Sequence, residues 1–150
     1  MRIPRDRLVI GFTAGVIAGL TMNILDLVLH LLNIPKLLFL DWAAITIYGS
    51  RPDSLQEAAL AFGVQLFFGG LLGIVFAYLL PLFKSRYHLF KGFVFGVTAW
   101  FVIHGLVIMF NYEGLRTISF ATALTDLIGS AVFGVVVAFV FKQLHDRVTV

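Results

Sequence analysis

The sequence predicts an all-α, polytopic membrane protein: one domain, 1–150, built as a four-transmembrane-helix bundle with a short external helix. The first observation is composition. Hydrophobic residues make up 60% of the chain and charged residues 13%, whereas about a quarter of the residues in a soluble domain are charged. The second is length, because four apolar stretches could each cross about 30 Å of hydrocarbon, which takes about 20 helical residues.

Residues that start or stop helices flank these stretches. The spans are predicted at 8–32, 56–83, 91–111 and 119–141. Asn33 and Pro35 close the first span, because proline disfavours helix in the residue before it. Ser54 and Glu57 form an S-x-x-E capping box that opens the second span. Ser119 is suited to cap the fourth.

The connection between the first two spans contains a fifth apolar stretch, 37–48, interrupted only by Asp41 and Thr46. Twelve residues are too few to span a bilayer. Asp41 is placed to cap a short helix that Gly49 would end. We therefore expect an interfacial or re-entrant helix on the external face, with a packed loop as the alternative.

The distribution of lysine and arginine predicts the orientation. Eight basic residues lie on the side that holds both termini and the middle loop: Arg2, Arg5, Arg7, Lys84, Arg86, Lys91, Lys142 and Arg147. Three lie on the other side: Lys36, Arg51 and Arg116. Because cytoplasmic loops carry the excess of basic residues, both termini are predicted to be cytoplasmic.

Several functional classes are disfavoured. The absence of cysteine excludes disulfides and thiolate chemistry. The net charge of +3 reflects basic residues that flank apolar spans, so the lipid bilayer and not nucleic acid is the expected partner. G-x-S-x-G, H-E-x-x-H and Gly-rich phosphate-loop motifs are missing, and we therefore predict that the chain is not an enzyme.

Six polar residues interrupt the predicted spans, and each needs a physical reason because an Asp at mid-helix costs about 2.5–3.5 kcal/mol on insertion. They are Asn23, Asp26, His30, Gln65, His104 and Asp126. Asp26, Gln65, His104 and Asp126, one on each helix, lie at a similar depth, about 9–12 Å below the external boundary. The sequence therefore predicts a polar intramembrane site in the outer half of the bilayer.

Glycines spaced for close helix packing lead toward this layer. They are Gly11, Gly15 and Gly19 on the first span and Gly92 and Gly96 on the third. Small residues let helix backbones approach closely in a membrane, so these faces are predicted to contact other helices and could form the interface of a homo-oligomer. The Gly11 and Gly92 stretches also match as an internal repeat that aligns Asn23 with His104, and the stretches 73–77 and 134–138 match and align Gln65 with Asp126.

Three kinds of function fit the polar layer. It could be a purely structural network in a non-transporting or partner-binding subunit, because buried polar groups in membranes find partners. It could instead serve ion or proton translocation by a homo-oligomer, because intramembrane carboxylates and histidines mark such pathways. Finally, Asp26, His30, His104 and Asp126 are candidate metal ligands, and His30 with His104 are candidate axial ligands of haem.

The chain also resembles uncharacterised small four-helix bacterial inner-membrane proteins. The resemblance rests on the stretch 11–19, on Asp41-Trp42-Ala43-Ala44 and on Lys91-Gly92-Phe93. It implies location in a bacterial plasma (inner) membrane, and it implies no activity or cofactor.

Overall fold

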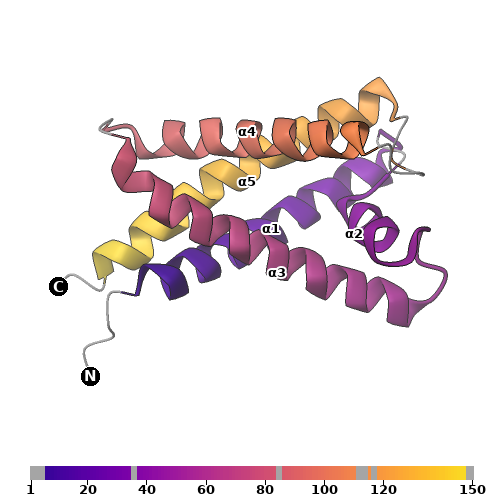
Figure 1. The fold of residues 1–150 in the computed structure, drawn as a ribbon, viewed down its shortest axis with the longest axis horizontal. Helices are drawn as coiled ribbons and strands as arrows, with labels where there is room; N and C mark the ends of the chain where they lie inside the picture. Colours follow the sequence, from indigo (N-terminus) through magenta and orange to yellow (C-terminus); the bar gives the residue numbers. More distant parts are fainter. Residues whose placement is uncertain (1–5, 35–36, 84–85, 111–114, 116–117, 148–150) are drawn as a thin grey trace.

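The computed structural model describes residues 6–34, 37–83, 86–110, 115 and 118–147. All regular structure within them is helical (Figure 1). The helices are α1 (Arg7–Leu31), α2 (Phe39–Tyr48), α3 (Leu55–Leu79), the 3₁₀ turn η1 (Leu80–Leu82), α4 (His88–Met109) and α5 (Phe120–Arg147). Four of these helices, all except α2 and η1, are long and apolar enough to cross a membrane. The all-helical prediction is therefore confirmed for the described residues.

The predicted helix ends are formed by local hydrogen bonds. The Ser54 hydroxyl accepts from the backbone N–H of Glu57 at 3.2 Å, and the Ser119 hydroxyl accepts from that of Thr122 at 3.2 Å. Each satisfies one of the first N–H groups of a helix, which have no partner inside it. Gly49 ends α2 with a φ of 78°, a left-handed conformation that glycine adopts without steric cost.

Some helix ends differ from the sequence prediction. Helix α5 continues to Arg147, beyond the predicted 119–141, because a helix can extend past its apolar stretch when its outer face meets water. Helix α3 ends at Leu79 and is followed by η1, whose second residue, Pro81, has no N–H to continue the helical ladder. Several residues used in the prediction lie outside the described residues: Arg2, Arg5, Pro35, Lys36, Lys84, Arg116 and the end of the third span at 111.

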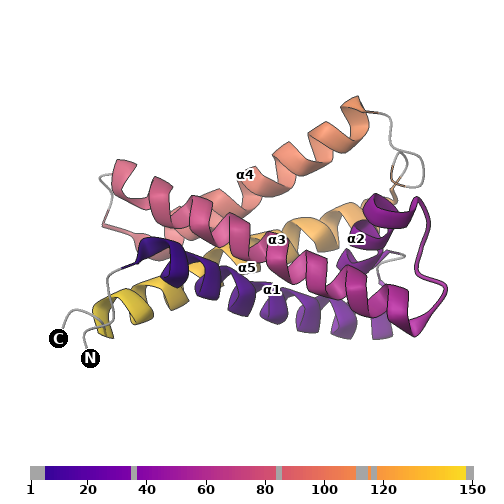
Figure 2. The same ribbon diagram turned by 60° about the horizontal axis from the view of Figure 1, so that its bottom comes forward.

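The long helices form an up-and-down bundle with one open side. Helix α1 packs along α3 and α5, and α4 packs along α5. The first residues of α1 and the last of α5 lie at one end of the bundle, which we call the terminal end (Figure 1). From there α3 and α4 diverge toward the opposite end, which we call the α2 end, and two views show this divergence (Figures 1 and 2).

Glycine contacts close both hairpins in the half of the bundle near the terminal end. At each contact a glycine faces the backbone of the partner helix so closely that an added Cβ would meet a carbonyl oxygen. The contacts are Gly11 with Gly73, Gly15 with Gly69, Gly92 with Gly134 and Gly96 with Ser130. These glycines therefore pack within the chain, and they are not free to form the interface between copies that the sequence suggested.

The two hairpins are equivalent in their packing as well as in sequence. The internal repeat aligns Gly11 with Gly92, and each faces a glycine carbonyl and an alanine Cβ of its partner helix. The aligned pair Asn23 and His104 also behave alike. Asn23 donates to the backbone oxygen four residues before it at 2.8 Å, and His104 contacts the corresponding oxygen, that of Trp100, at 3.1 Å.

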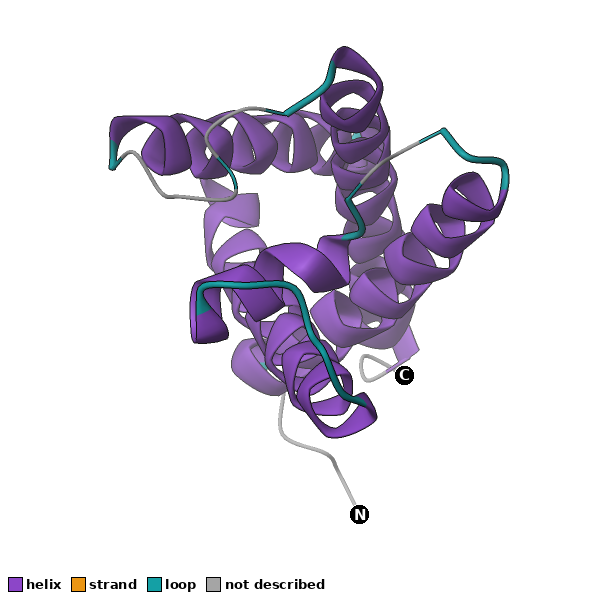
Figure 3. Cartoon of the chain, turned by 90° about the vertical axis from the view of Figure 1, so that its right-hand side faces the viewer, coloured by secondary structure: helices purple, strands orange, loops and turns teal. Residues whose placement is uncertain are grey.

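Helix α2 occupies the space that opens at the α2 end. It packs against α3 and α1, and a view from this end places it among the long helices (Figure 3). Its Ile45 forms a small core with Leu37 and Leu115, against which Trp42 and Val107 also pack. The short stretch 37–48 therefore ties α3 to the far ends of α4 and α5.

Candidate functional site

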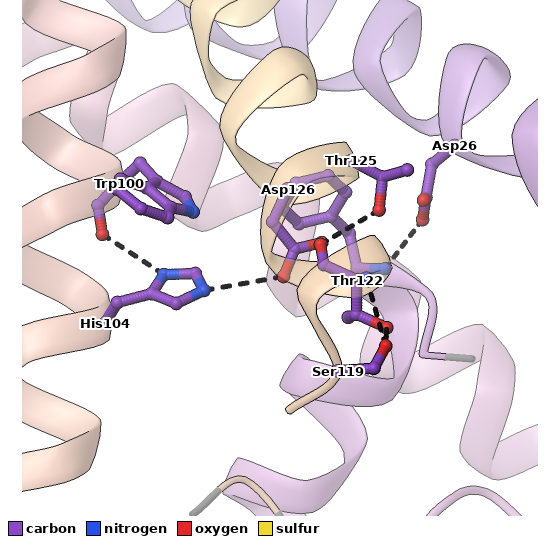
Figure 4. Close-up of polar contacts among 8 residues, drawn as sticks. Asp26, Trp100, His104, Ser119, Thr122, Thr125 and Asp126 are labelled. Carbon is purple, nitrogen blue, oxygen red and sulfur yellow. Dashed lines mark hydrogen bonds and ion pairs between the residues drawn. The ribbon is translucent and has the colours of Figure 1, made fainter. Parts of the chain in front are cut away.

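His104 and Asp126 form a buried pair between α4 and α5. The imidazole Nε2 lies 3.5 Å from Asp126 Oδ2, and the side chains are 13% and 0% exposed (Figure 4). Neither carboxylate oxygen has a hydrogen-bond partner among the described residues. A buried charge without hydrogen bonds is costly, so the imidazole and the nearby Trp42 indole are the groups that can stabilise an ionised Asp126.

The position of the imidazole is set by its neighbours. Its Nδ1 lies 3.1 Å from the backbone oxygen of Trp100, one turn earlier on α4. Its ring is flanked by the rings of Trp100 and Trp42, with centroids 4.8 Å away in both cases. A carbonyl oxygen can only accept, so Nδ1 carries the hydrogen. In neutral His104 the nitrogen without a proton is therefore Nε2, which faces Asp126.

This geometry gives the pair a defined proton chemistry. One proton between His104 and Asp126 can lie on the carboxyl, leaving both groups neutral, or on the imidazole, giving an ion pair. Without that proton, an ionised Asp126 would be buried beside a neutral ring, which is unfavourable. The pair can thus hold one proton, and because Asp126 and His104 Nε2 are both buried, exchange of that proton requires the imidazole to move.

Hydroxyl groups on the first turns of α5 lie below the pair and bond to one another. The Ser119 hydroxyl is 3.0 Å from that of Thr122, and the Thr125 hydroxyl donates to the Thr122 carbonyl at 2.9 Å (Figure 4). These bonds organise the start of α5 beside Asp126 without supplying it with a donor. Sequence reasoning used Ser119 as a cap but did not identify the threonines, whose spacing on one helix face was visible.

Asp26 bonds to the backbone of α2 and also interacts electrostatically with Asp126. Its Oδ2 accepts the backbone N–H of Phe39 at 2.7 Å, so α1 caps the first turn of α2. Asp41, predicted as the cap, is the third residue of α2, and it accepts the N–H of Leu38 at 2.9 Å. Two carboxylates thus satisfy free N–H groups at the positive end of the α2 dipole, and Asp26 is directed at α2, not at His104.

The remaining predicted residues, Asn23, His30 and Gln65, make no hydrogen bond to the His104–Asp126 pair among the described residues. Asn23 bonds to its own helix, and His30 lies in the last turn of α1, where it interacts electrostatically with Asp26. Gln65 on α3 has both side-chain atoms buried without a partner. The polar layer therefore contains the His104–Asp126 pair, the Asp26 cap of α2, which is close enough to Asp126 for the two carboxyl groups to interact electrostatically, and Gln65.

The candidate metal and haem sites are not assembled. No group of three or more His, Asp or Glu side chains that could hold a metal ion occurs in the described part of the chain, so Asp26, His30, His104 and Asp126 do not form one ligand set. Both ring nitrogens of His104 already face protein groups, which leaves neither directed at an open position for haem iron.

A cavity of about 310 Å³ lies beside the pair, in the gap between α3 and α4. Its wall is mostly apolar, with Gln65 on one side and Trp100 and His104 on the other, and Trp42 of α2 also lines it. His104 is therefore the member of the pair that reaches the cavity. Trp42 was not recognised in the sequence as a site residue, because only the fold brings α2 against α4.

Comparison with protein-family models, curated proteins and solved structures finds no match for this chain.

Proposed function

We propose that the chain spans a bacterial plasma membrane four times, with both termini cytoplasmic and α2 as a re-entrant helix on the external side. The length and apolar composition of α1, α3, α4 and α5 support the spans. The excess of Lys and Arg near the terminal end supports the orientation. The bond from Asp26 to the first residue of α2 supports the re-entrant arrangement, because Asp26 lies more than one helical turn before the end of α1.

Within this membrane protein, the proposed function is movement of protons, alone or together with a bound solute, and the His104–Asp126 pair is the proton-binding site. The observation that carries the proposal is the 3.5 Å contact of a fully buried Asp126 with an imidazole that also lines a cavity. Intramembrane carboxylates and histidines that face an interior cavity mark proton relays in other membrane proteins.

The route through the site would have two parts. On the external side the cavity leads to His104, and the imidazole would turn toward the cavity to exchange a proton before passing it to and from Asp126. On the cytoplasmic side, glycine contacts close each hairpin backbone against backbone, so release in that direction requires the two hairpins to move relative to each other. The other acidic groups near this end, Asp26 on α1 and Asp41 on α2, are bonded to backbone N–H groups.

The test is proton flux into liposomes that contain the purified protein and a pH-sensitive dye. Asp126→Asn keeps the shape of the side chain and can still hydrogen-bond Nε2, but it cannot hold the exchangeable proton. We expect it to abolish flux, as His104→Gln should. Asp41→Asn is the matched control, because its amide oxygen can still accept from Leu38, and it should retain flux.

The second candidate is a non-transporting or partner-binding subunit with a structural polar network, and Asp26 favours it. This intramembrane carboxylate serves a structural purpose, since it caps α2. If Asp126→Asn leaves flux unchanged while lowering the midpoint of thermal unfolding, Asp126 is structural in the same way, and the proton proposal is wrong.

Assembly into a homo-oligomer is part of the proposal, because four helices leave little room for a closed pathway. The interface would have to use faces other than the packed glycines, such as the exposed apolar surface of α3 and α4. Mass measurement in mild detergent tests it, and a monomer under all conditions that retain flux would rule it out.

A further inference from the structure

The cavity between α3 and α4 has a wall without fixed charge. Among its twenty lining residues there is no Asp, Glu, Lys or Arg, and His104 is the one group that can ionise. A charged occupant would lose its hydration shell there without gaining a counter-ion, which is costly. The cavity volume of about 310 Å³ lies at the lower end of the range for small-molecule sites, about 300–1,000 Å³. Its chemistry therefore suits a small, uncharged molecule.

Polar groups without a partner interrupt the apolar wall. Gln65 contributes an amide oxygen and an amide nitrogen, both buried and both without a hydrogen bond. The indole nitrogen of Trp100, on the opposite wall, is also buried without a partner. Leaving such groups unsatisfied costs about 1–3 kcal/mol each. An occupant with a hydroxyl or carbonyl group would satisfy some of them and would lie with its polar end toward these groups.

The gap faces the side of the bundle, so entry would be from the hydrocarbon. Helices α3 and α4 diverge along this gap, whereas each packs closely on another helix (Figures 1 and 2). Phe68 and Val64 of α3 line the cavity and are 47% and 42% exposed, so this part of the wall is not covered by another helix. At the α2 end, Trp42 and Ile47 of α2 form part of the wall.

We propose that this cavity binds an uncharged lipophilic molecule with a hydroxyl or carbonyl group, which enters from the membrane between α3 and α4 and is held by Gln65 and Trp100. This is a ligand site separate from the proton-binding role of Asp126, and it does not depend on proton movement. The apolar body of the ligand would lie along Phe68 and Val107, and its polar group would bridge the two helices.

Tryptophan fluorescence provides a direct test, because Trp42 and Trp100 are the two tryptophans of the chain and both line the cavity. The probe is bromoundecanol, whose bromine quenches indole fluorescence on contact, added to protein in lipid nanodiscs. Bromoundecane, which lacks the hydroxyl, is the matched probe. We expect saturable quenching by bromoundecanol that unbrominated undecanol reverses. Half-saturation should require about two- to tenfold less alcohol than alkane, the ratio that one hydrogen bond provides.

Substitutions of Gln65 test whether this residue makes the hydrogen bond to the polar group of the ligand. Gln65→Leu should remove the preference for the alcohol, and Gln65→Met, which keeps the side-chain length, should do the same if leucine disturbs folding. Gln56→Leu, the same change at an exposed position of α3 outside the cavity, should leave the preference intact. The proposal is overturned if quenching rises linearly without saturation, if both probes act equally on the wild type, or if Gln65→Leu keeps the preference.

The Asp126→Asn variant distinguishes this ligand site from the proposed proton-binding site. Asp126→Asn should lose proton flux and still bind bromoundecanol, because Asp126 does not line the cavity. Quenching that disappears in Asp126→Asn while the protein remains folded would instead show that one site serves both purposes.

Discussion

Gly96 on α4 offers the sharpest test of the packing, because there is no space for a methyl group at this position. A Cβ at Gly96 would lie against the carbonyl oxygen of Ser130, and the next atoms, at 3.0 and 3.1 Å, also belong to the backbone of α5. Backbone cannot rotate away as a side chain can. Gly96→Ala should therefore destabilise the protein by about 1–3 kcal/mol through overpacking, reduced by up to about 1 kcal/mol by the better helix propensity of alanine.

Gly105, two and a half turns later on α4, is the matched control. A Cβ there would meet no atom within 4 Å, so Gly105→Ala should be neutral or stabilising by about 0.5–1 kcal/mol. The assay is loss of helical circular dichroism when the denaturing detergent SDS is titrated into mild micelles. Gly15→Ala on α1, which would meet the carbonyl of Gly69, should cost about as much as Gly96→Ala. If Gly96→Ala is as stable as Gly105→Ala, the close backbone contact does not exist.

Two further predictions concern α2 and the orientation. Asp26→Leu leaves the N–H of Phe39 without its acceptor, which should cost about 1–3 kcal/mol and speed hydrogen exchange in α2. Asp26→Asn, whose amide oxygen can still accept, should cost less, and equal exchange rates in the two variants would contradict the cap. Because the chain has no cysteine, a single Gln56→Cys should react with an impermeant maleimide added outside intact cells. A single Gln143→Cys should react only after lysis, and the reverse pattern would overturn the orientation.

The four long helices were predictable because the signal is local. Span length, apolar composition, Ser54, Ser119 and Gly49 act within one helix or one turn, so the sequence alone indicates where helices start and stop. The end that differs most is that of α5, which extends to Arg147, and it depends on how the bundle surrounds the helix after its apolar stretch has ended. The position of such a helix end is a property of the whole bundle, and the spacing of apolar residues in the sequence does not predict it.

The candidate site was predictable in depth but not in direction. Counting residues from helix ends places Asp26 and Asp126 at similar levels, yet the rotation of α1 and α5 turns one carboxylate to the N–H of Phe39 and the other to His104. Asn23, Asp26 and His30 share a helix face by spacing. Asn23 nevertheless bonds to its own helix, Asp26 bonds to α2, and His30 interacts electrostatically with Asp26. Whether α2 enters the bundle depends on the connection at 33–53, whose path only the fold reveals, so Trp42 could not be assigned to the site.

The equivalence of the two hairpins explains where the site lies. If the hairpins were related by a twofold axis, the seam between α1 and α5 would be repeated between α4 and α3. The first seam is packed, whereas the second is open, contains the cavity and is bordered by α2. The polar residues differ in the same region, because Asn23 and Gln65 of the first hairpin correspond to His104 and Asp126 of the second. Glycine packing, which both hairpins share, accounts for the scaffold. His104 of the buried pair between α4 and α5 also lines the cavity at the open seam, so the proposed proton-binding pair adjoins the place where the two halves depart from each other.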